Sequence, residues 1–363
     1  MTDHSADDRP GGLDGLGWDS FFQEHFRALG LPGTVPGRVV SESKGSFRVA
    51  CRDGEITATV SGRLRFRAGE ERRYPAVGDW VAVRLLPAED RGIVQAVLPR
   101  KSRFSRQAAG PRTGEQVLAA NIDTVFIVSG LDGGRAFNLR RMERYLTLAW
   151  SSGAVPVLVL NKADLCPDVA AFVRRVEGIA PGVPVYPVSA LEKTGLAPLW
   201  TCLAPGRTAA FLGSSGVGKS ALINALLGEE RQETGEIRGR DHTGRHTTTR
   251  RELLLLPGGG AVIDTPGLRE LQLWAGEEDL DGTFRDIEEL ARDCRFSDCR
   301  HAAESGCAVK AAVDRGDLDP ARLVSYRKLQ KELRYHALKE EQGVRRFEKQ
   351  RWKNWMKGKP DWP

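Results

Sequence analysis

Long apolar runs are what this sequence of 363 residues lacks most plainly. None approaches the roughly 18 residues that a membrane-spanning helix needs, so we expect no membrane partner. The first 33 residues hold six acidic and two basic residues with clustered glycines, a composition typical of neither a secretory signal nor an anchor. We therefore expect a cytoplasmic monomer that begins with a disordered acidic arm, residues 1–33.

Cysteine is also scarce, with six in the chain, and a disulfide framework is the poorer explanation for them in a cytosolic protein. Three are scattered, and we expect them to be ordinary buried thiols: Cys51, Cys166 and Cys202. The others fall within 14 residues of one another and include a histidine: Cys294, Cys299, His301 and Cys307. Three thiolates and one imidazole form a closed tetrahedral set, which predicts one structural Zn²⁺; a redox pair is the alternative.

An acidic surplus is missing too, because Lys and Arg outnumber Asp and Glu by 54 to 48. The basic excess lies in residues 34–106, with 15 basic and 8 acidic residues, and in residues 319–363, with 13 and 6. Two basic segments around a slightly acidic middle favour a polyanionic partner, and RNA is the one we expect. A solvated basic surface is the alternative for each segment.

The first basic segment reads as β structure. Short alternating stretches with turn residues between them lie at residues 37–40, 46–50, 57–60, 63–67, 79–83 and 92–97. This spacing predicts a small closed barrel of the OB type over residues 34–106. In the stretch 63–67, three arginines would lie on one strand face, with Leu64 and Phe66 on the other.

A phosphate-binding loop is indicated by the pattern GxxxxGKS at residues 213–220. It follows a short apolar stretch and precedes a helical one, so backbone N–H groups would face the phosphates. Lys219 would reach the β- and γ-phosphates, and the Ser220 hydroxyl would ligate Mg²⁺. The nucleotide-contacting residues predicted here are Gly213, Ser214, Ser215, Gly216, Val217, Gly218, Lys219, Ser220 and Ala221.

A guanine-reading motif, NKxD, comes earlier in the chain and follows the apolar stretch 155–160. A carboxylate can accept from the N1–H and the exocyclic amine of guanine, a donor pair that adenine lacks. A second motif follows residues 185–188 and would contact the guanine carbonyl. The residues predicted for these two contacts are Asn161, Lys162, Ala163 and Asp164, and then Ser189, Ala190 and Leu191.

A DxxG motif at residues 264–267 follows the apolar stretch 261–263. Asp264 would hold a magnesium-bound water, and the Gly267 amide would sense the γ-phosphate. Because the guanine motifs precede the phosphate loop, the sequence predicts a circularly permuted α/β G domain over residues 107–285. Its first strand is expected at 122–128, before a helix over 139–149 capped by Asn138. In this order the switch segments lead directly into the C-terminal module, so nucleotide state could be transmitted to it.

That module is expected over residues 286–363, as a zinc-binding unit followed by a basic helix from 320 to 358. Trp352 and Trp355 lie among its Arg and Lys residues, a mixture suited to phosphate contact and base stacking. An amphipathic helix docked on the G domain is the alternative.

From about residue 34 the chain resembles the bacterial ribosome small subunit-dependent GTPase A family. The matching segments are residues 116–123, 161–164, 213–220, 244–249 and 264–267, together with the Cys/His quartet. The resemblance implies hydrolysis of GTP to GDP, stimulated by the small ribosomal subunit, and a role in its late maturation through rRNA near the decoding region.

The expected catalytic machinery departs from that of many GTPases, which carry a water-orienting glutamine directly after DxxG. Here that residue is Leu268, so the sequence predicts weak intrinsic turnover. The resemblance assigns a water-positioning role to His246, in the switch segment 238–250; a loop histidine in an RNA-contacting segment is the alternative. We expect Thr248 to complete magnesium coordination, although Thr247 or Thr249 could do so.

Two other functions remain open from the sequence. The chain could be a nucleotide-gated RNA scaffold whose hydrolysis is incidental. It could also be an ATP-using, kinase-like P-loop enzyme, against which both guanine motifs argue.

Overall fold

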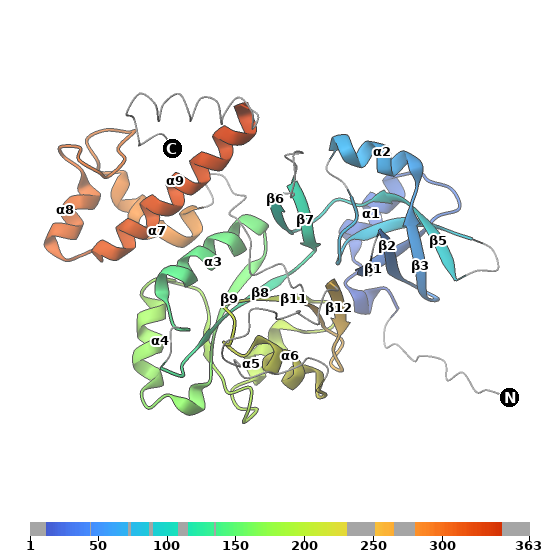
Figure 1. Cartoon of the computed structure of the whole chain (residues 1–363), viewed down its shortest axis with the longest axis horizontal. Helices are drawn as coiled ribbons and strands as arrows, with labels where there is room; N and C mark the ends of the chain where they lie inside the picture. Colours follow the sequence, from blue (N-terminus) through green and yellow to red (C-terminus); the bar gives the residue numbers. More distant parts are fainter. Residues whose placement is uncertain are drawn as a thin grey trace, which may run out of the picture.

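The computed structural model describes residues 12–43, 45–71, 74–86, 90–107, 115–133, 136–230, 251–264 and 280–342. Three parts follow one another in Figure 1: a blue barrel, a green and yellow α/β domain, and a group of orange and red helices. Among these residues, no helix is long and apolar enough to cross a membrane.

The barrel has five strands: β1 (Val35–Ser43), β2 (Ser46–Cys51), β3 (Gly54–Val60), β4 (Trp80–Leu85) and β5 (Arg91–Val97). They hydrogen-bond in the order β1-β2-β3-β5-β4, and β4 pairs back onto β1, which closes the barrel. The side chains inside it are wholly buried and mostly branched or aromatic: Val39, Phe47, Val49, Val81, Val83 and Val94. The predicted closed barrel is confirmed.

One stretch predicted as a barrel strand is instead a helix, α2 (Gly62–Glu71). The Ser61 hydroxyl accepts a hydrogen bond from the Leu64 amide at 3.2 Å, as an N-cap residue does. Leu64 is buried, whereas Phe66 is 75% exposed, so the two do not share a face as predicted. Alternation over five residues is too short to exclude a helix, and Arg, Leu and Ala are good helix formers.

The expectation of a disordered arm is wrong for residues 12–33. This stretch holds a 3-10 turn, η1 (Asp14–Leu16), and a helix, α1 (Ser20–Ala28), capped by the Asp19 side chain. Phe22 is 2% exposed, and the Trp18 ring lies 4.7 Å from the Trp80 ring of the barrel, centroid to centroid. The acidic residues and glycines suggested disorder, and composition alone does not indicate that aromatic side chains of this segment pack against the barrel. The first part of the expected arm, residues 1–11, lies outside the described residues.

The barrel joins the α/β domain through a hairpin and a buried arginine. Strands β6 (Arg103–Gln107) and β7 (Glu115–Ala120) pair with each other in a separate two-stranded sheet. Arg38 of β1 donates to the carbonyls of Leu16, Gly78 and Asn121, which belong to three different segments. Its burial lowers the pKa of Arg38 to about 10, although Asp123 and Asp79 oppose the shift. A buried cation bonded to three segments holds them in one arrangement.

The α/β domain is built on parallel strands in the order β10-β9-β8-β11-β13, with antiparallel β12 beside β13. These strands are β8 (Thr124–Gly130), β9 (Val155–Asn161), β10 (Val185–Pro187), β11 (Thr208–Leu212), β12 (Arg251–Leu255) and β13 (Ala261–Asp264). Strands β9, β11 and β13 end at the NKxD, phosphate-loop and DxxG motifs respectively. Because parallel strands end at one edge of a sheet, the fold places all three motifs along that edge.

The helices and the short turn of this domain lie between its strands in the chain: α3 (Leu139–Ser152), η2 (Ala163–Leu165), α4 (Val169–Glu177), α5 (Ala197–Cys202) and α6 (Lys219–Leu227). Asn138 caps α3 by accepting from the Arg141 amide, as predicted. The rotated order of motifs therefore sits on an ordinary doubly wound sheet.

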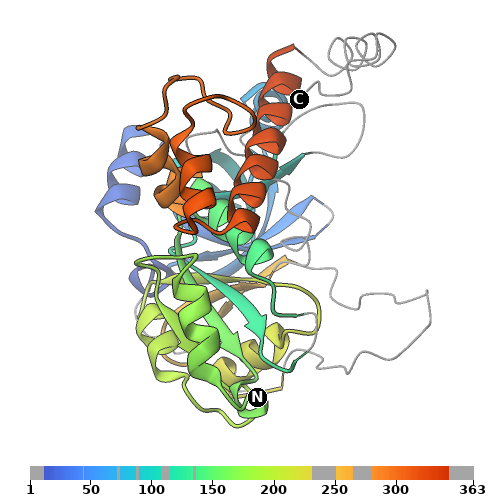
Figure 2. The ribbon, with the colours of Figure 1, turned by 90° about the vertical axis from the view of Figure 1, so that its left-hand side faces the viewer.

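The C-terminal part contains α7 (Asp281–Ala291), α8 (Ala308–Arg315) and α9 (Pro320–Gln342). Figure 2 shows red α9 lying beside green α3 of the α/β domain. Buried Arg322 of α9 donates to Asp286 of α7 at 2.7 Å and to Glu143 of α3 at 3.0 Å. Helix α7 spans the boundary expected at 285–286 and packs on both α3 and α8. The tail of the expected basic helix, with Trp352 and Trp355, lies outside the described residues.

Candidate functional site

The phosphate loop joins β11 to α6, and α6 begins at Lys219 directly after Gly218. The N-terminal end of α6, whose first N–H groups have no acceptor within the helix, therefore lies at the loop. The Lys219 amine lies over the same loop and donates to the carbonyls of Gly213 at 2.8 Å and Ser214 at 2.6 Å. A concave ring of backbone donors with one ammonium beside it is suited to a polyphosphate.

Two glycines of this loop are required by their surroundings as well as by their backbone angles. Gly218 has φ +92°, and a Cβ there would lie 2.2 Å from the Asn161 side-chain nitrogen. At Gly213, a Cβ would lie 2.5 Å from the Val128 carbonyl oxygen. The loop thus touches the carboxyl ends of β8 and β9, which any side chain at these positions would push away.

Asn161, the first residue of the NKxD motif, connects the three predicted nucleotide motifs. Its side-chain nitrogen donates to the Val217 carbonyl in the phosphate loop at 2.9 Å. Its side-chain oxygen accepts from the Ala190 amide, in the second guanine motif, at 3.0 Å. Asn161 is 2% exposed, so both bonds are shielded from water. Segments separated by up to 56 residues therefore meet at one side chain.

The rest of the guanine motif is positioned by backbone bonds and one ion pair. The Ala163 amide donates to the Val188 carbonyl at 3.0 Å, which ties the motif to the chain leaving β10. Lys162 has a left-handed backbone, φ +63°, and its amine pairs with Asp132 in the loop after β8. Asp164 is exposed, so its carboxylate is accessible to a ligand. The sequence reasoning missed Asp132, although a carboxylate just after a parallel strand next to β9 was a usable signal.

Asp264 ends β13 and pairs across the sheet with Glu252, the second residue of β12. Its strand lies next to β11, so Asp264 is at the edge that carries the phosphate loop. Together with the Ser220 hydroxyl at the start of α6, it offers the oxygen ligands that Mg²⁺ prefers. Three predicted site residues lie outside the described residues: His246, Thr248 and Gly267.

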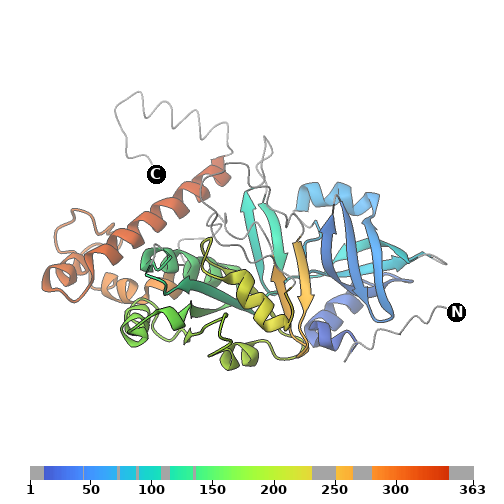
Figure 3. The same ribbon diagram turned by 60° about the horizontal axis from the view of Figure 1, so that its bottom comes forward.

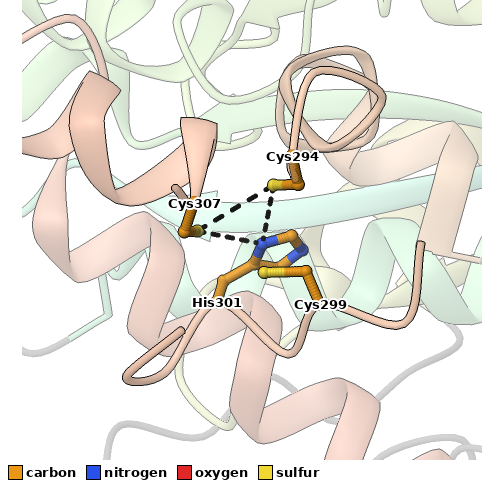
Figure 4. Close-up of side chains that lie close together, drawn as sticks. All are labelled: Cys294, Cys299, His301 and Cys307. Atoms are coloured by element: carbon orange, nitrogen blue, oxygen red, sulfur yellow. Dashed lines mark hydrogen bonds between the residues drawn. The ribbon is translucent and has the colours of Figure 1, made fainter. Parts of the chain in front are cut away.

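The four predicted metal ligands converge, as Figure 4 shows. One ligand atom from each lies within 4.8 Å of the others: Cys294, Cys299, His301 and Cys307. The His301 Nδ1 atom is 3.4 Å from the Cys307 sulfur and 3.6 Å from the Cys294 sulfur. A tetrahedral zinc site with bonds of about 2.0–2.3 Å places its ligand atoms about 3.5–3.8 Å apart. The cluster therefore has the size of a metal site.

The surroundings of the cluster favour the thiolate form at Cys294, whereas burial raises the pKa of Cys299 to about 11. Burial raises the pKa of Cys294, but hydrogen bonds from the Val309 and Ala308 amides outweigh it, and the net pKa lies below its ordinary value. Cys307 caps α8, and its sulfur accepts from the Lys310 amide at 3.4 Å. Burial lowers the pKa of His301, which keeps the imidazole neutral, as a ligand must be. This set can bind a metal ion.

The chain is similar to a family of known GTPases. A model of the RsgA GTPase family matches residues 97–274. The small ribosomal subunit biogenesis GTPase RsgA of Opitutus terrae is 50% identical over 355 residues, which cover 95% of this chain and 96% of that protein. RsgA of Streptomyces coelicolor is 45% identical over 335 residues, covering 92% and 89%.

Solved structures share the architecture. YjeQ of Thermotoga maritima is 30% identical, with a TM-score of 0.62, and the match covers 83% of this chain and 98% of that one. YloQ, described as a circularly permuted GTPase, has the same fold at 24% identity and a TM-score of 0.60, with 83% and 95% covered. The near-complete match to the Opitutus protein, with the family model over the nucleotide motifs, shows that this chain belongs to the RsgA GTPase family.

Proposed function

We propose that this chain hydrolyses GTP to GDP and phosphate, that the small ribosomal subunit stimulates the reaction, and that it acts late in the assembly of that subunit. Membership of the family establishes the general function, a GTP-hydrolysing enzyme of ribosome biogenesis. Stimulation is supported by Leu268, which stands where many GTPases carry a water-orienting glutamine, and the late timing is what the family resemblance implies. The observation that carries the proposal is the Asn161 side chain, which bonds both the phosphate loop and the second guanine motif.

Each nucleotide residue would have a separate task. Asp164 would accept from the guanine N1–H and amine, and the Ala190 region would face the guanine carbonyl. Lys219 and the loop amides would bind the β- and γ-phosphates. The remaining contacts proposed are those of Lys162, Ala163, Ser189, Leu191, Gly213, Ser214, Ser215, Gly216, Val217, Gly218, Ala221 and Gly267.

Magnesium would enter with the nucleotide. The Ser220 hydroxyl and Thr248 would ligate it, and Asp264 would hold one of its waters. Mg²⁺ held by these residues would neutralise charge on the phosphates. His246, to which the family resemblance assigns this role, would orient the attacking water. The side chain of Leu268, which follows DxxG, has no hydrogen-bonding group. The absence of a glutamine there supports weak turnover by the free chain.

The metal cluster is proposed to hold one structural Zn²⁺ through Cys294, Cys299, His301 and Cys307. Four protein ligands fill a tetrahedral shell and leave no position for a substrate. The ion would fix the loop between α7 and α8, which has few apolar side chains of its own. The cluster thus belongs to the architecture rather than to the reaction.

The partner proposed is the rRNA of the small subunit. It would meet two basic parts, the barrel over residues 34–106 and the C-terminal module over 286–363, on either side of the G domain over 107–285. Figure 1 places the barrel and the C-terminal helices at opposite ends of the molecule. We propose that the chain acts as a cytoplasmic monomer.

The decisive assay is multiple-turnover hydrolysis with and without purified small subunits. We expect GTP turnover to rise by about 10³-fold or more when subunits are added, the low end for a catalytic group supplied in trans. ATP should be hydrolysed at background rates in both conditions. Binding of subunits without faster turnover would favour a nucleotide-gated scaffold, and equal use of ATP would sink the GTPase assignment.

A further inference from the structure

Strand β12 joins the sheet of the G domain to the barrel, and we call its contact with β1 the seam. Its first two residues, Arg251 and Glu252, come directly after the segment 238–250 that the sequence predicts as a switch. On its inner side β12 pairs with β13, and on its outer side it pairs with barrel strand β1. Figure 3 shows orange β12 and β13 beside the blue barrel. One sheet therefore continues from the nucleotide edge into the barrel.

A single row of residues crosses this seam. Ser41 of β1 lies opposite Glu252 of β12, and Glu252 lies opposite Asp264 of β13. On the barrel side, Arg48 of β2 lies opposite Ser41. Residues directly opposite one another point to the same face of a sheet, so these four side chains line one face in order.

Two ion pairs reinforce the seam. Arg48 and Glu252 approach to 3.5 Å, guanidinium nitrogen to carboxylate oxygen. The neighbouring pair joins Arg251 to Glu42 of β1 at 3.2 Å, and both side chains are partly buried. Burial lowers the pKa of Arg251, and Glu42 opposes that shift. Among the described residues, the pairing between β1 and β12 covers two residue pairs, so these side chains matter for its register.

The row also has an electrostatic consequence. Glu252 and Asp264 are carboxylates placed directly opposite each other, an arrangement that costs free energy unless a cation lies close. Arg48 supplies a cation from the barrel, which Glu252 shares with Glu55 of β3. The end of β13, where the DxxG carboxylate lies, is therefore linked through Glu252 to a side chain of the barrel.

We propose that Glu42 and Arg48 of the barrel are positioning residues for GTP hydrolysis, acting through Arg251 and Glu252 on Asp264. The inference rests on the proposed function, because it concerns the rate of that reaction. Neither side chain needs to touch nucleotide. A partner that binds the barrel can then change turnover without reaching the active site.

The test compares steady-state GTP hydrolysis, with small subunits present, by the full-length wild-type chain and by Glu42→Gln and Arg48→Gln variants. We expect kcat to fall about fivefold or more, the lower end of usual coupling between sites, with KM changed by less than about twofold. Arg48→Lys keeps the charge and should retain most of the wild-type kcat. Arg207→Gln is the matched control, because its ion pair with Asp123 lies at the start of β11.

A charge exchange separates positioning from folding. Glu42→Arg combined with Arg251→Glu restores an ion pair in reversed polarity, so kcat should return to within about threefold of wild type if the pair is what matters. Melting temperatures measured on all variants identify any that fail to fold. If the wild-type chain hydrolyses GTP and kcat is unchanged in both Gln variants, the inference is overturned but the proposed function is not. A wild-type chain that leaves GTP intact would overturn the proposed function and the inference together.

Discussion

The side-chain nitrogen of Asn161 donates to the carbonyl of Val217 at 2.9 Å, across 56 residues of sequence. One partner belongs to the guanine motif and the other to the phosphate loop. The bond is possible because β9 and β11 are parallel strands that end at the same edge. The rotated order of motifs along the chain therefore leaves their arrangement in space intact.

Replacing Asn161 by Ala should uncouple the two motifs. The variant leaves a buried carbonyl and a buried amide without partners, each worth about 1–3 kcal/mol. We expect the Kd for GTP, measured by calorimetry, to rise at least tenfold. Asn138→Ala, which removes only the α3 cap, should lower the free energy of unfolding by about 1 kcal/mol and leave GTP affinity unchanged. If the Asn161→Ala variant binds GTP as tightly as the wild-type protein, Asn161 does not couple the two motifs.

Two glycines at the ends of α6 provide a matched pair. Gly218→Ala places a Cβ 2.2 Å from the Asn161 nitrogen, so we expect nucleotide binding to be lost. Gly228 has a similar backbone, φ +74°, but open space around it, so Gly228→Ala should cost about 1 kcal/mol of stability and retain binding. Fluorescent GDP binding and chemical denaturation would measure both. Loss of binding in both variants would argue against a specific steric cause.

Metal removal should affect the C-terminal module selectively. Cys307→Ser breaks the ligand set, so we expect elemental analysis to show less than a tenth of the wild-type zinc, and limited proteolysis to cleave the loop between α7 and α8. Guanine-nucleotide binding should persist, because the nucleotide residues lie on other elements. Cys202 lies outside the cluster, so the Cys202→Ser variant should contain as much zinc as the wild-type protein. A wild-type zinc content in the Cys307→Ser variant would contradict the proposal that the cluster binds the metal.

The ion pair between Arg322 and Glu143 should matter for stability, with a pH dependence of defined sign. Glu143 is wholly buried and pairs with both Arg322 and Arg140, so Arg322→Ala would remove one of its two cationic partners, at a cost of about 3–5 kcal/mol at pH 7. Burial raises the pKa of Glu143, even though Arg140 and Arg322 lower it in part. When the pKa of a carboxyl is higher in the folded than in the unfolded protein, the free energy of unfolding falls as pH rises from the unfolded pKa through the folded pKa.

Losing Arg322 raises that folded pKa further. The destabilisation should therefore be smaller at pH 5 than at pH 7, measured by urea denaturation of both proteins. Exposed Arg315→Ala should show neither the cost nor the pH dependence. A penalty that grows toward pH 5 would contradict this account of Glu143.

Much of the nucleotide edge could be predicted from the sequence, because each motif directly follows an apolar strand and parallel strands share an edge. The Cys/His spacing was equally informative, since four ligands within 14 residues have little freedom to separate. What could not be predicted depends on distant partners. Trp18 orders the N-terminal segment only because Trp80 lies beside it, and Glu252 gains its position from β1. Residues 63–67 were misassigned because five alternating residues suit a strand and a helix alike.

The central claim, that Asp164 reads guanine in a pocket shared with the phosphate loop, is tested most directly by exchanging its carboxylate for an amide. Xanthine carries a carbonyl where guanine has its amine, so the Asp164→Asn side chain can donate to it. Calorimetric titration of both proteins with GTP, XTP and ATP should show wild type preferring GTP by about 10²-fold or more. The variant should prefer XTP. A variant that still prefers GTP, or a wild-type chain that binds ATP equally well, would contradict the account.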